Sequence, residues 1–236
     1  MLTSNDTVLP RQEDKTEAVR GMFDAIAPRY ELVNKLMTFG LDASWRRRAV
    51  ESLGLTADCI VLDLACGTGD LSRTAAAQQL EVIGADLSLG MLSASHGTGP
   101  LLQADASALP IADGAIDGIL CGYALRNFTD LPACLDEMAR VLRPGGRLSL
   151  LEVAIPRSKL LRTGHRVWFQ HAVPVIGGLL SDRVAYRYLP ASTVYLPDPD
   201  ELRSLLIDRG FSGVNHHLLS GGISQLFTAT RRDLQE

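Results

Sequence analysis

The sequence predicts an α/β protein of one domain, residues 1–236, with a doubly wound, mostly parallel sheet, N-terminal helices, a helical insertion and a C-terminal antiparallel hairpin. The first reason is that short apolar runs alternate with helical patterns between residues 59 and 153, as in parallel β-α units. The second is that four of the five runs end near Gly, Asp or Glu, where the loops of such a sheet build ligand sites. The third is that 236 residues, 46% of them hydrophobic, can bury one full core.

The N-terminal half supplies helices and then strands. Three segments with helical spacing, punctuated by Pro28 and Gly40, cover residues 16–27, 29–38 and 42–53. The apolar runs predict strands over residues 59–64, 81–85, 101–103, 115–121 and 146–153. A helix over residues 131–142 ends before the turn Pro144-Gly-Gly146 that leads into the last strand.

The C-terminal part predicts one more helix and a hairpin. The helix begins with Asp198 as N-cap and Pro199 in its first turn, and residues 214–219 and 223–230 form the hairpin. The expected divisions of the domain are a flexible tail (1–14), an N-terminal helical cover (16–53), a cofactor-binding core (59–153), a helical insertion (155–190) and the C-terminal helix and hairpin (198–230).

Charge and cysteine usage exclude several classes of protein. The net charge of −4 has the wrong sign for a protein that grips a nucleic-acid backbone. The four cysteines form no C-x-x-C pair and the five histidines no i,i+4 ligand pair, so we expect neither a metal site nor a disulfide framework. No window supplies the roughly 18 apolar residues that span a bilayer, and the N-terminus lacks the apolar core of a signal peptide. The expectation is a soluble, cytoplasmic protein.

The segment Asp63-Leu-Ala-Cys-Gly-Thr-Gly-Asp70 lies directly between the first predicted strand and a helix. Gly67 and Gly69 let the backbone turn tightly and let a ligand lie against it, and the N-terminus of the helix favours a negative group. Thr68 belongs to the same predicted cofactor-binding turn. A tight turn without a ligand is the alternative for so short a motif.

Two acids downstream extend this motif. Asp86 ends the second strand, 17 residues after Gly69, where a carboxylate can accept both hydroxyls of an adenosine ribose. Asp105 follows the third strand and can accept from the adenine amino group. A helix cap at Asp86 and a loop role for Asp105 are the structural alternatives. The other predicted cofactor-binding residues here are Leu87, Met91 and Ala106, the first two as apolar walls for the ring.

Two classes of adenosine-binding protein compete for this pattern. A nicotinamide-dependent dehydrogenase wants a third glycine, in G-x-G-x-x-G, where this chain has Ser72. The acids Asp63, Asp86 and Asp105, together with the two glycines, resemble instead a class I S-adenosylmethionine-dependent methyltransferase with a Rossmann-like fold. This resemblance implies S-adenosylmethionine as cofactor, with Asp63 orienting the loop.

Motifs outside this turn narrow the resemblance. They are Phe23-Asp-Ala-Ile-Ala-Pro-Arg-Tyr30 with Asn34, Gly40 and Trp45-Arg46; Arg126-Asn127; Arg143-Pro-Gly-Gly146-Arg147; and Tyr186-Arg-Tyr-Leu-Pro190. Together they are similar to the ubiquinone/menaquinone biosynthesis C-methyltransferase family over about residues 16–223. The resemblance implies methylation of a ring carbon of a polyprenylated benzoquinol or naphthoquinol. After the double glycine Gly221-Gly222, the segment up to Thr228 lacks the His and Gly usual in the family, which leaves another small aromatic acceptor as the alternative.

The reaction requires electron density on the acceptor ring. A quinol hydroxyl with a pKa near 10 is ionised to about one part in a thousand at neutral pH, so stabilising its oxyanion helps greatly. We expect Arg126 and Asn127 to do so, with Arg126 acting through an ordered water and Asp70, because a guanidinium cannot normally act as a base. A salt bridge plus a helix cap is the structural alternative for this pair.

Four aromatic or polar residues are expected at the acceptor. Tyr30 and Asn34 lie four residues apart on one helical face, where they can form a hydrogen-bonding pair in the acceptor pocket. Their alternative role is helix packing. Trp168 of the insertion and Tyr188 are the other predicted substrate contacts.

Residues 157–190 are predicted to touch a membrane, because a polyprenyl acceptor would lie in the bilayer. Residues 155–190 hold six basic groups and one acid, and an apolar run covers residues 172–180. A lid over the site is the alternative. The expected partners are therefore a quinol-type aromatic and the inner face of a membrane, with a homodimer left open. A non-catalytic S-adenosylmethionine-binding subunit remains the alternative from another functional class.

Overall fold

The computed structural model describes residues 14–156, 158–168, 188 and 191–233. All but the last residue of the predicted tail (1–14) and most of the predicted insertion (155–190) lie outside the described residues. Seven strands form one sheet in the order β3-β2-β1-β4-β5-β7-β6. They are β1 (Ile60–Leu64), β2 (Glu81–Asp86), β3 (Leu101–Gln103), β4 (Ile116–Gly122), β5 (Leu142–Val153), β6 (Phe211–Leu219) and β7 (Ser224–Arg231).

The first five strands are parallel, and the C-terminal hairpin joins them antiparallel through β7. This confirms the predicted doubly wound, mostly parallel sheet. In the register of the central strands, Leu64 is paired with Ala85 on one side and with Cys121 on the other. The carboxyl ends of β1, β2 and β4 therefore lie level, and the segments that follow them meet at one edge of the sheet.

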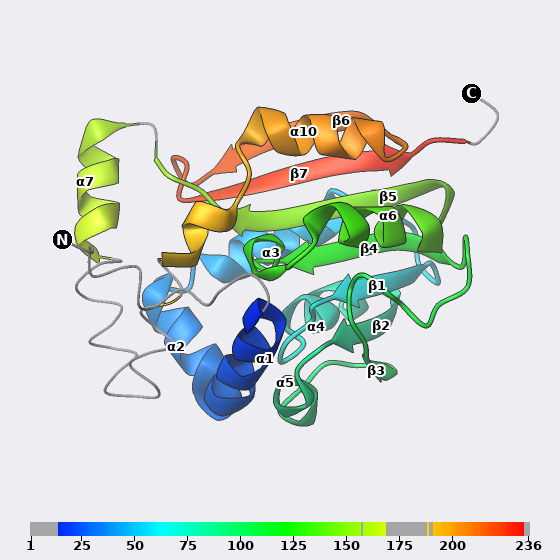
Figure 1. Ribbon diagram of the computed structural model, residues 1–236, viewed down its shortest axis with the longest axis horizontal. Coiled ribbons are helices and arrows are strands. Elements are labelled where there is room, and N and C mark those ends of the chain that lie inside the picture. The colour runs from blue at the N-terminus through cyan, green and yellow to red at the C-terminus, as the bar shows by residue number, and fades with distance from the viewer. Residues whose placement is uncertain (1–13, 157, 169–187, 189–190, 234–236) are drawn as a thin grey trace.

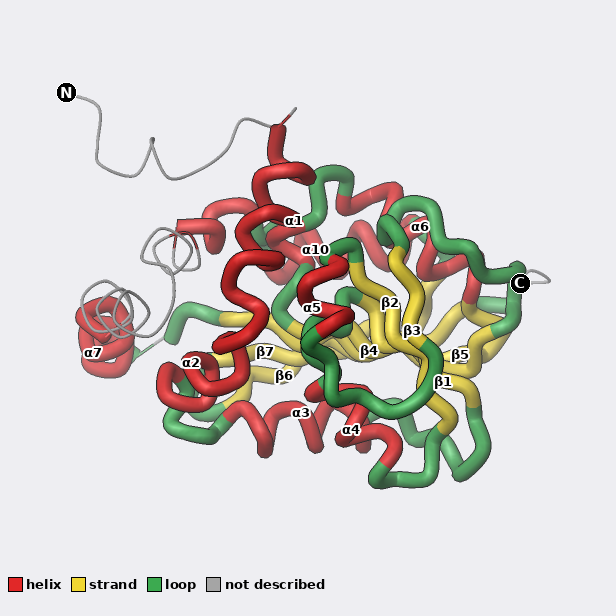
Figure 2. The backbone as a smooth tube through the Cα atoms, turned by 90° about the horizontal axis from the view of Figure 1, so that it is seen from below, coloured by secondary structure: helices red, strands yellow, loops and turns green. Residues whose placement is uncertain are grey.

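Helices cover both faces of the sheet (Figure 2). On one face lie α3 (Asp42–Glu51) and α4 (Asp70–Ala76), whose Trp45 and Leu71 pack with Val61 and Leu120 of the sheet. On the other lie α6 (Leu131–Val141) and α10 (Pro199–Asp208), which enclose the larger core. The apolar runs of the central strands are buried on both faces, as expected for parallel strands.

The remaining helices lie at the carboxyl edge of the sheet. In Figure 1 the arrowheads of β4 and β5 point toward α1 (Lys15–Ile26), α2 (Tyr30–Met37) and α7 (Lys159–Val167). A short 3-10 helix, η2 (Ala27–Arg29), joins α1 to α2 and contains Pro28, the predicted break. Ile26, Val33 and Met37 form a small apolar cluster with Met91 of α5 (Leu89–Ser93), which packs the N-terminal helices onto the edge.

The largest difference from a predicted strand is at the start of β5, and β6 also begins earlier than predicted, at Phe211 and not at residue 214. β5 begins at Leu142, directly after α6, and not at residue 146. Leu142 is paired with Ile116 of β4, and the register then shifts, so the expected turn is an irregularity within the strand. Gly145 has a φ of 75°, and a Cβ on Gly146 would lie 2.8 Å from the carbonyl oxygen of Arg143. The two glycines therefore permit this irregularity.

Candidate active site

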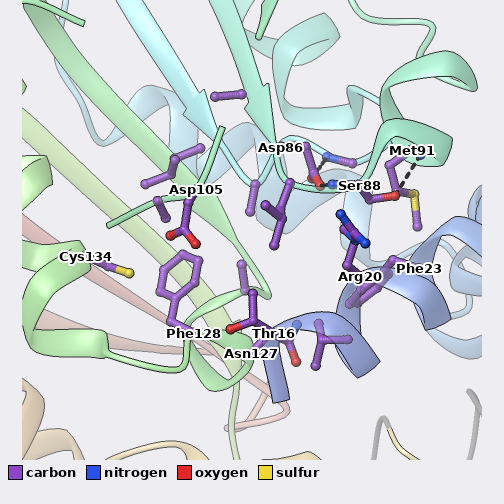
Figure 3. A pocket seen from close by; sticks show the side chains of 18 of the residues that line it. Thr16, Arg20, Phe23, Asp86, Ser88, Met91, Asp105, Asn127, Phe128 and Cys134 are labelled. Carbon is purple, nitrogen blue, oxygen red and sulfur yellow. Dashed lines mark hydrogen bonds between the residues drawn. The ribbon is translucent and has the colours of Figure 1, made fainter. Parts of the chain in front are cut away.

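A cavity of about 330 Å³ lies at the carboxyl ends of β1, β2 and β4. One wall comes from the strand ends and carries Asp86 and Asp105 (Figure 3). The opposite wall comes from α1, which contributes Thr16, Arg20 and Phe23. Eight predicted site residues line it, namely Tyr30, Gly67, Asp86, Leu87, Met91, Asp105, Ala106 and Asn127.

Asp86 connects the strand end to the glycine turn. Its Oδ2 accepts a hydrogen bond from the backbone N–H of Gly67, and its Oδ1 accepts one from the N–H of Ser88, each at 2.8 Å. Burial raises the pKa of this carboxyl, which the two backbone donors partly oppose. A carboxylate has about four lone-pair positions, so both oxygens can accept a second hydrogen bond. Because Ser88 caps α5 with its own hydroxyl, bonded to the N–H of Met91 at 3.0 Å, Asp86 is not needed as the cap.

Asp105 lies above the ring of Phe128 in Figure 3. Its Oδ1 accepts from the N–H and the hydroxyl of Ser107, at 2.8 and 2.7 Å. This local pairing fixes the carboxylate at the cavity wall, and Oδ2 is the oxygen with acceptor capacity to spare. The next residue, Ala106, is buried and also lines the cavity, and Met91 lies across the cavity beside Ser88 (Figure 3).

The two glycines of the turn have different roles. Gly67 has a φ of 55°, and a Cβ there would meet only the Sδ atom of Met91 at 4.0 Å, so this position is open toward the cavity. Gly69 has a φ of 86° and precedes α4, and a Cβ there would lie 2.6 Å from the backbone nitrogen of Gly97. Gly69 therefore packs its Cβ side against the backbone of Gly97 and is not among the residues that line the cavity, so a ligand contact at Gly69 stays a prediction. Thr68 also stays outside this cavity, and its carbonyl accepts from the N–H of His96 at 3.0 Å.

Asp63, one of the predicted cofactor-binding residues, does not line the cavity. It is fully buried, and its Oδ2 accepts from the hydroxyl of Ser72 in α4 at 2.6 Å. Among the described residues its Oδ1 has no hydrogen-bond partner. Burial raises the pKa of Asp63 to about 7. The side chain ties β1 to α4 and so supports the turn between them from below.

Asp70 is engaged elsewhere. One oxygen lies 3.1 Å from Nη1 of Arg46, and the other pairs with Arg73, which also contacts Glu31 at 3.0 Å. This network joins α4 to α2 and α3. No direct contact between Asp70 and Arg126 is found among the described residues, and the water-linked pair of these two stays a prediction.

Arg126 belongs to η3 (Leu125–Asn127), after β4. It is buried, and its Nη1 pairs with Oε1 of Glu152 while its Nε donates to the hydroxyl of Ser192 at 3.2 Å. A salt bridge is thus present, as in the structural alternative for this residue. The neighbouring Asn127 lines the cavity, and its Oδ1 accepts from the phenol of Tyr188 at 3.2 Å.

Tyr30 and Asn34 form the predicted hydrogen-bonding pair, and Tyr30 lines the cavity while Asn34 stays behind it. Burial raises the pKa of Tyr30, whereas its bond to Asn34 and the positive charge of Arg126 lower it. The same charge opposes the rise in the pKa of Tyr188, which reaches about 12 through burial. Arg126 therefore lies within electrostatic reach of both tyrosines.

Trp168 is not among the residues that line the cavity, and its role as a substrate contact stays a prediction. Its Nε1 donates to the carbonyl of Met37 at 3.0 Å, and its ring lies 4.5 Å from that of Phe39. It fastens the end of the described part of the insertion to α2.

Sequence reasoning missed the wall formed by α1. The residues Thr16, Val19, Arg20 and Phe23 line the cavity at positions i, i+3, i+4 and i+7 of that helix. This spacing places them on one face, which the sequence shows, but it does not show what that face covers. Tyr123, with a φ of 60°, was also missed at the end of β4.

The described residues contain no group of three or more side chains suited to hold a metal ion, and none of their helices is long and apolar enough to cross a membrane. All four cysteines are free thiols. The burial of Cys66 raises the pKa of its thiol, which keeps it protonated beside the turn.

Comparison with known proteins identifies a family model and similar sequences that match most of this chain. The model of the ubiE/COQ5 methyltransferase family matches residues 11–231. The chain is 42% identical over 221 residues to the ubiquinone/menaquinone biosynthesis C-methyltransferase UbiE of Syntrophotalea carbinolica, covering 90% of this chain and 93% of that one. It is also 42% identical over 220 residues to the demethylmenaquinone methyltransferase of Thermus thermophilus, covering 89% of this chain and 100% of that one.

Solved structures share the fold. A SAM-dependent methyltransferase of Thermotoga maritima superposes with a TM-score of 0.63 and 17% identity, over 90% of this chain and 99% of that one. Phosphoethanolamine N-methyltransferase 2 of Haemonchus contortus, solved with S-adenosyl-L-methionine, gives a TM-score of 0.60 and 13% identity, over 80% of this chain and 52% of that one. The predicted class of enzyme and its methyl donor, S-adenosylmethionine, are confirmed. The chain belongs to the ubiE/COQ5 methyltransferase family.

Proposed function

We propose that this methyltransferase transfers a methyl group to a ring carbon of a quinol in menaquinone or ubiquinone biosynthesis. The observation that carries the proposal is the 42% identity, over nine tenths of the chain, to a curated C-methyltransferase of quinone biosynthesis. The cavity supports the proposal, because it is lined both by Tyr30 and Asn127, which are suited to an acceptor, and by Asp86 and Asp105, which are suited to a nucleoside.

The cofactor would be held by the strand-end wall of the cavity. Asp86 offers carboxylate oxygens for the ribose hydroxyls, Asp105 offers Oδ2 for the adenine amino group, and the open space over Gly67 accepts a ligand close to the backbone. Leu87 and Met91 supply apolar contact. When bound, S-adenosylmethionine supplies an electrophilic methyl group.

The acceptor would be activated by the charge of Arg126. An aromatic hydroxyl ionises more readily next to a guanidinium, and the resulting oxyanion makes the ring carbon more nucleophilic. Asn127 and Tyr30 line the cavity near Arg126, and the phenol of Tyr188 holds the amide of Asn127 by its oxygen. The amide nitrogen of Asn127 is thereby directed for donation to an acceptor oxygen, which orients the ring.

A product analysis tests this function. The purified protein is incubated with labelled S-adenosylmethionine and a panel of reduced demethyl-quinones and simple phenols. We expect a demethyl-quinol to gain one methyl group, and NMR of the product to place that methyl on carbon. Methylation of the phenols alone would move the assignment to another small aromatic, and methylation on oxygen would refute C-methylation. Binding of the cofactor with no product from any acceptor would favour a non-catalytic subunit.

The quinol of this reaction class carries a polyprenyl tail, so we further propose that residues 157–190 contact an anionic membrane surface. Most of this segment lies outside the described residues. Its described part supports the proposal, because α7 exposes Leu161 (46%) and Val167 (53%) beside the basic residues Lys159 and Arg162. Flotation with anionic liposomes should show attachment at low salt that is lost at high salt. No attachment at low salt, with activity kept on a short-chain quinol, would make the segment a lid.

A further inference from the structure

A buried ion pair involves Arg126, the chain neighbour of the cavity residue Asn127. Glu152, the last residue but one of β5, is fully buried, and its Oε1 accepts from Nη1 of Arg126 and from the N–H of Val153, the latter at 2.8 Å. The hydroxyl of Ser192 accepts from Nε of Arg126 at 3.2 Å. Two protein groups, on β5 and on η5 (Ser192–Tyr195), therefore hold two of the three nitrogens of the guanidinium.

The third nitrogen of the guanidinium, Nη2, is not held in this way by the described residues. Within the part of the chain that the structure describes, Nη2 of Arg126 makes no hydrogen bond. A guanidinium is planar and its donors point in fixed directions, so fixing Nε and Nη1 also fixes the direction of Nη2. Asn127, next in the chain, lines the cavity.

We propose that Glu152 is a positioning residue for methyl transfer, which holds Arg126 so that Nη2 is directed at the acceptor oxygen. This inference rests on the proposed function, in which Arg126 stabilises the acceptor oxyanion. A donor already oriented before the oxyanion forms stabilises it without reorganisation at the moment of reaction. Glu152 also supplies the negative charge that makes a buried arginine tolerable.

The pair is poorly explained as a device for stability. Burying two charges brings little net stability compared with apolar residues of similar size. In addition, Oε2 of Glu152 has no hydrogen-bond partner among the described residues, which is a further cost. A costly arrangement of this kind, at the carboxyl end of a strand beside the cavity, is typical of a functional site.

A double-mutant cycle tests the proposal. Arg126→Gln should lower kcat on the order of a hundredfold, the scale for losing one stabilising donor, and Glu152→Gln on the order of tenfold, each with little change in cofactor affinity. The double variant should be no slower than Arg126→Gln alone, because Glu152 acts through Arg126. The matched control is Ser149→Ala, a buried residue of the same strand whose hydroxyl donates to the carbonyl of Ala49 at 2.9 Å. It should lower Tm and leave kcat unchanged.

Losses that multiply in the double variant, or an unchanged kcat in Glu152→Gln, would overturn the proposal. If Glu152→Gln does not fold, Ser192→Ala replaces it in the cycle, with the same non-additivity expected on a smaller loss.

A second readout does not depend on turnover. In ¹⁵N NMR spectra the Nε–H of Arg126 should give a slowly exchanging signal that exchanges rapidly in Glu152→Gln or Ser192→Ala. An unchanged signal in both variants would show that neither residue holds the guanidinium. A wild-type protein that methylates no quinol would refute the proposed function, whereas this spectrum tests the anchoring on its own.

Discussion

Replacing Asp86 by Ala should remove most of the affinity for S-adenosylmethionine. The carboxylate is already held by the N–H groups of Gly67 and Ser88, so its remaining lone pairs are fixed in direction before a ligand binds. Each hydrogen bond to a charged group contributes about 1.5–3 kcal/mol, and the carboxylate can accept from both hydroxyls of the ribose. In the variant, hydrogen bonds to water restore only part of this free energy to the hydroxyls. We therefore expect a loss of about 2–4 kcal/mol, which is a roughly 30- to 700-fold rise in Kd.

Isothermal titration calorimetry on the folded variant measures this loss. Asp86→Asn keeps one acceptor oxygen and loses the charge, so its Kd should lie between those of the wild type and Asp86→Ala. The matched control is Asp117→Asn at the opposite edge of the sheet, where Oδ2 of Asp117 accepts from the N–H of Ile60 at 2.7 Å. Unchanged affinity in a folded Asp86→Ala protein would refute the ribose assignment, and an equal loss in Asp117→Asn would assign the effect to the fold.

Two further predictions concern the turn. Gly69→Ala should lower Tm more than Gly67→Ala, because both carry a left-handed strain of about 1–2 kcal/mol but only the Cβ at position 69 would meet the backbone of Gly97. Gly67→Ala should instead weaken cofactor binding more for each degree of Tm lost. The opposite ranking in thermal melts and calorimetry would contradict these roles. The pKa of Asp63 is about 7 in the folded protein against the ordinary value of 3.8, so the folded protein binds the proton of this carboxyl more tightly than the unfolded chain does. The contribution of this group to the free energy of unfolding is therefore fully present below pH 3.8 and is lost as the pH rises to about 7. At about 1.4 kcal/mol per pH unit, the stability of Asp63→Asn relative to wild type should rise on the order of 4 kcal/mol between about pH 4 and 8 in urea unfolding; a difference that does not vary with pH would rule out the raised pKa.

Local signals predicted most of the fold because each has a local physical cause. Asp198 caps α10 as expected, its carboxylate accepting from the N–H of Asp200 at 3.0 Å, with Pro199 in the first helical position. The start of β5 was misplaced because α6 runs into the strand without a polar residue between them. Leu142 satisfies the helical spacing and also pairs with Ile116, and that pairing is a long-range fact that periodicity does not contain.

The predicted acids of the site fall into two groups, those that line the cavity and those that do not. Asp86 and Asp105 follow strands, and parallel strands end at one edge, so sequence position alone brings both to the cavity. Asp63 and Asp70 lie on either side of the glycine turn, and their sequence positions suggest a place at the cavity just as strongly. Their side chains leave the site because Ser72 and Arg46 attract them, on helices whose placement depends on packing. Chain position thus predicts where the backbone goes more reliably than where a carboxylate points.

The helix α1 shows why the opposite wall escaped prediction. Its apolar cluster with Met91 gives it a reason to pack, but its position over the cavity is fixed at both ends by polar contacts distant in sequence. At its start Lys15 donates to the carbonyl of Phe128 at 2.8 Å, and near its end Asp24 accepts from the N–H of Gly90 at 2.8 Å. One contact is to the segment after β4 and the other to the helix after β2, which are the two segments that flank the strand-end wall. The N-terminal helix is therefore built into the cavity as its second wall, and a ligand that fills the cavity must contact it.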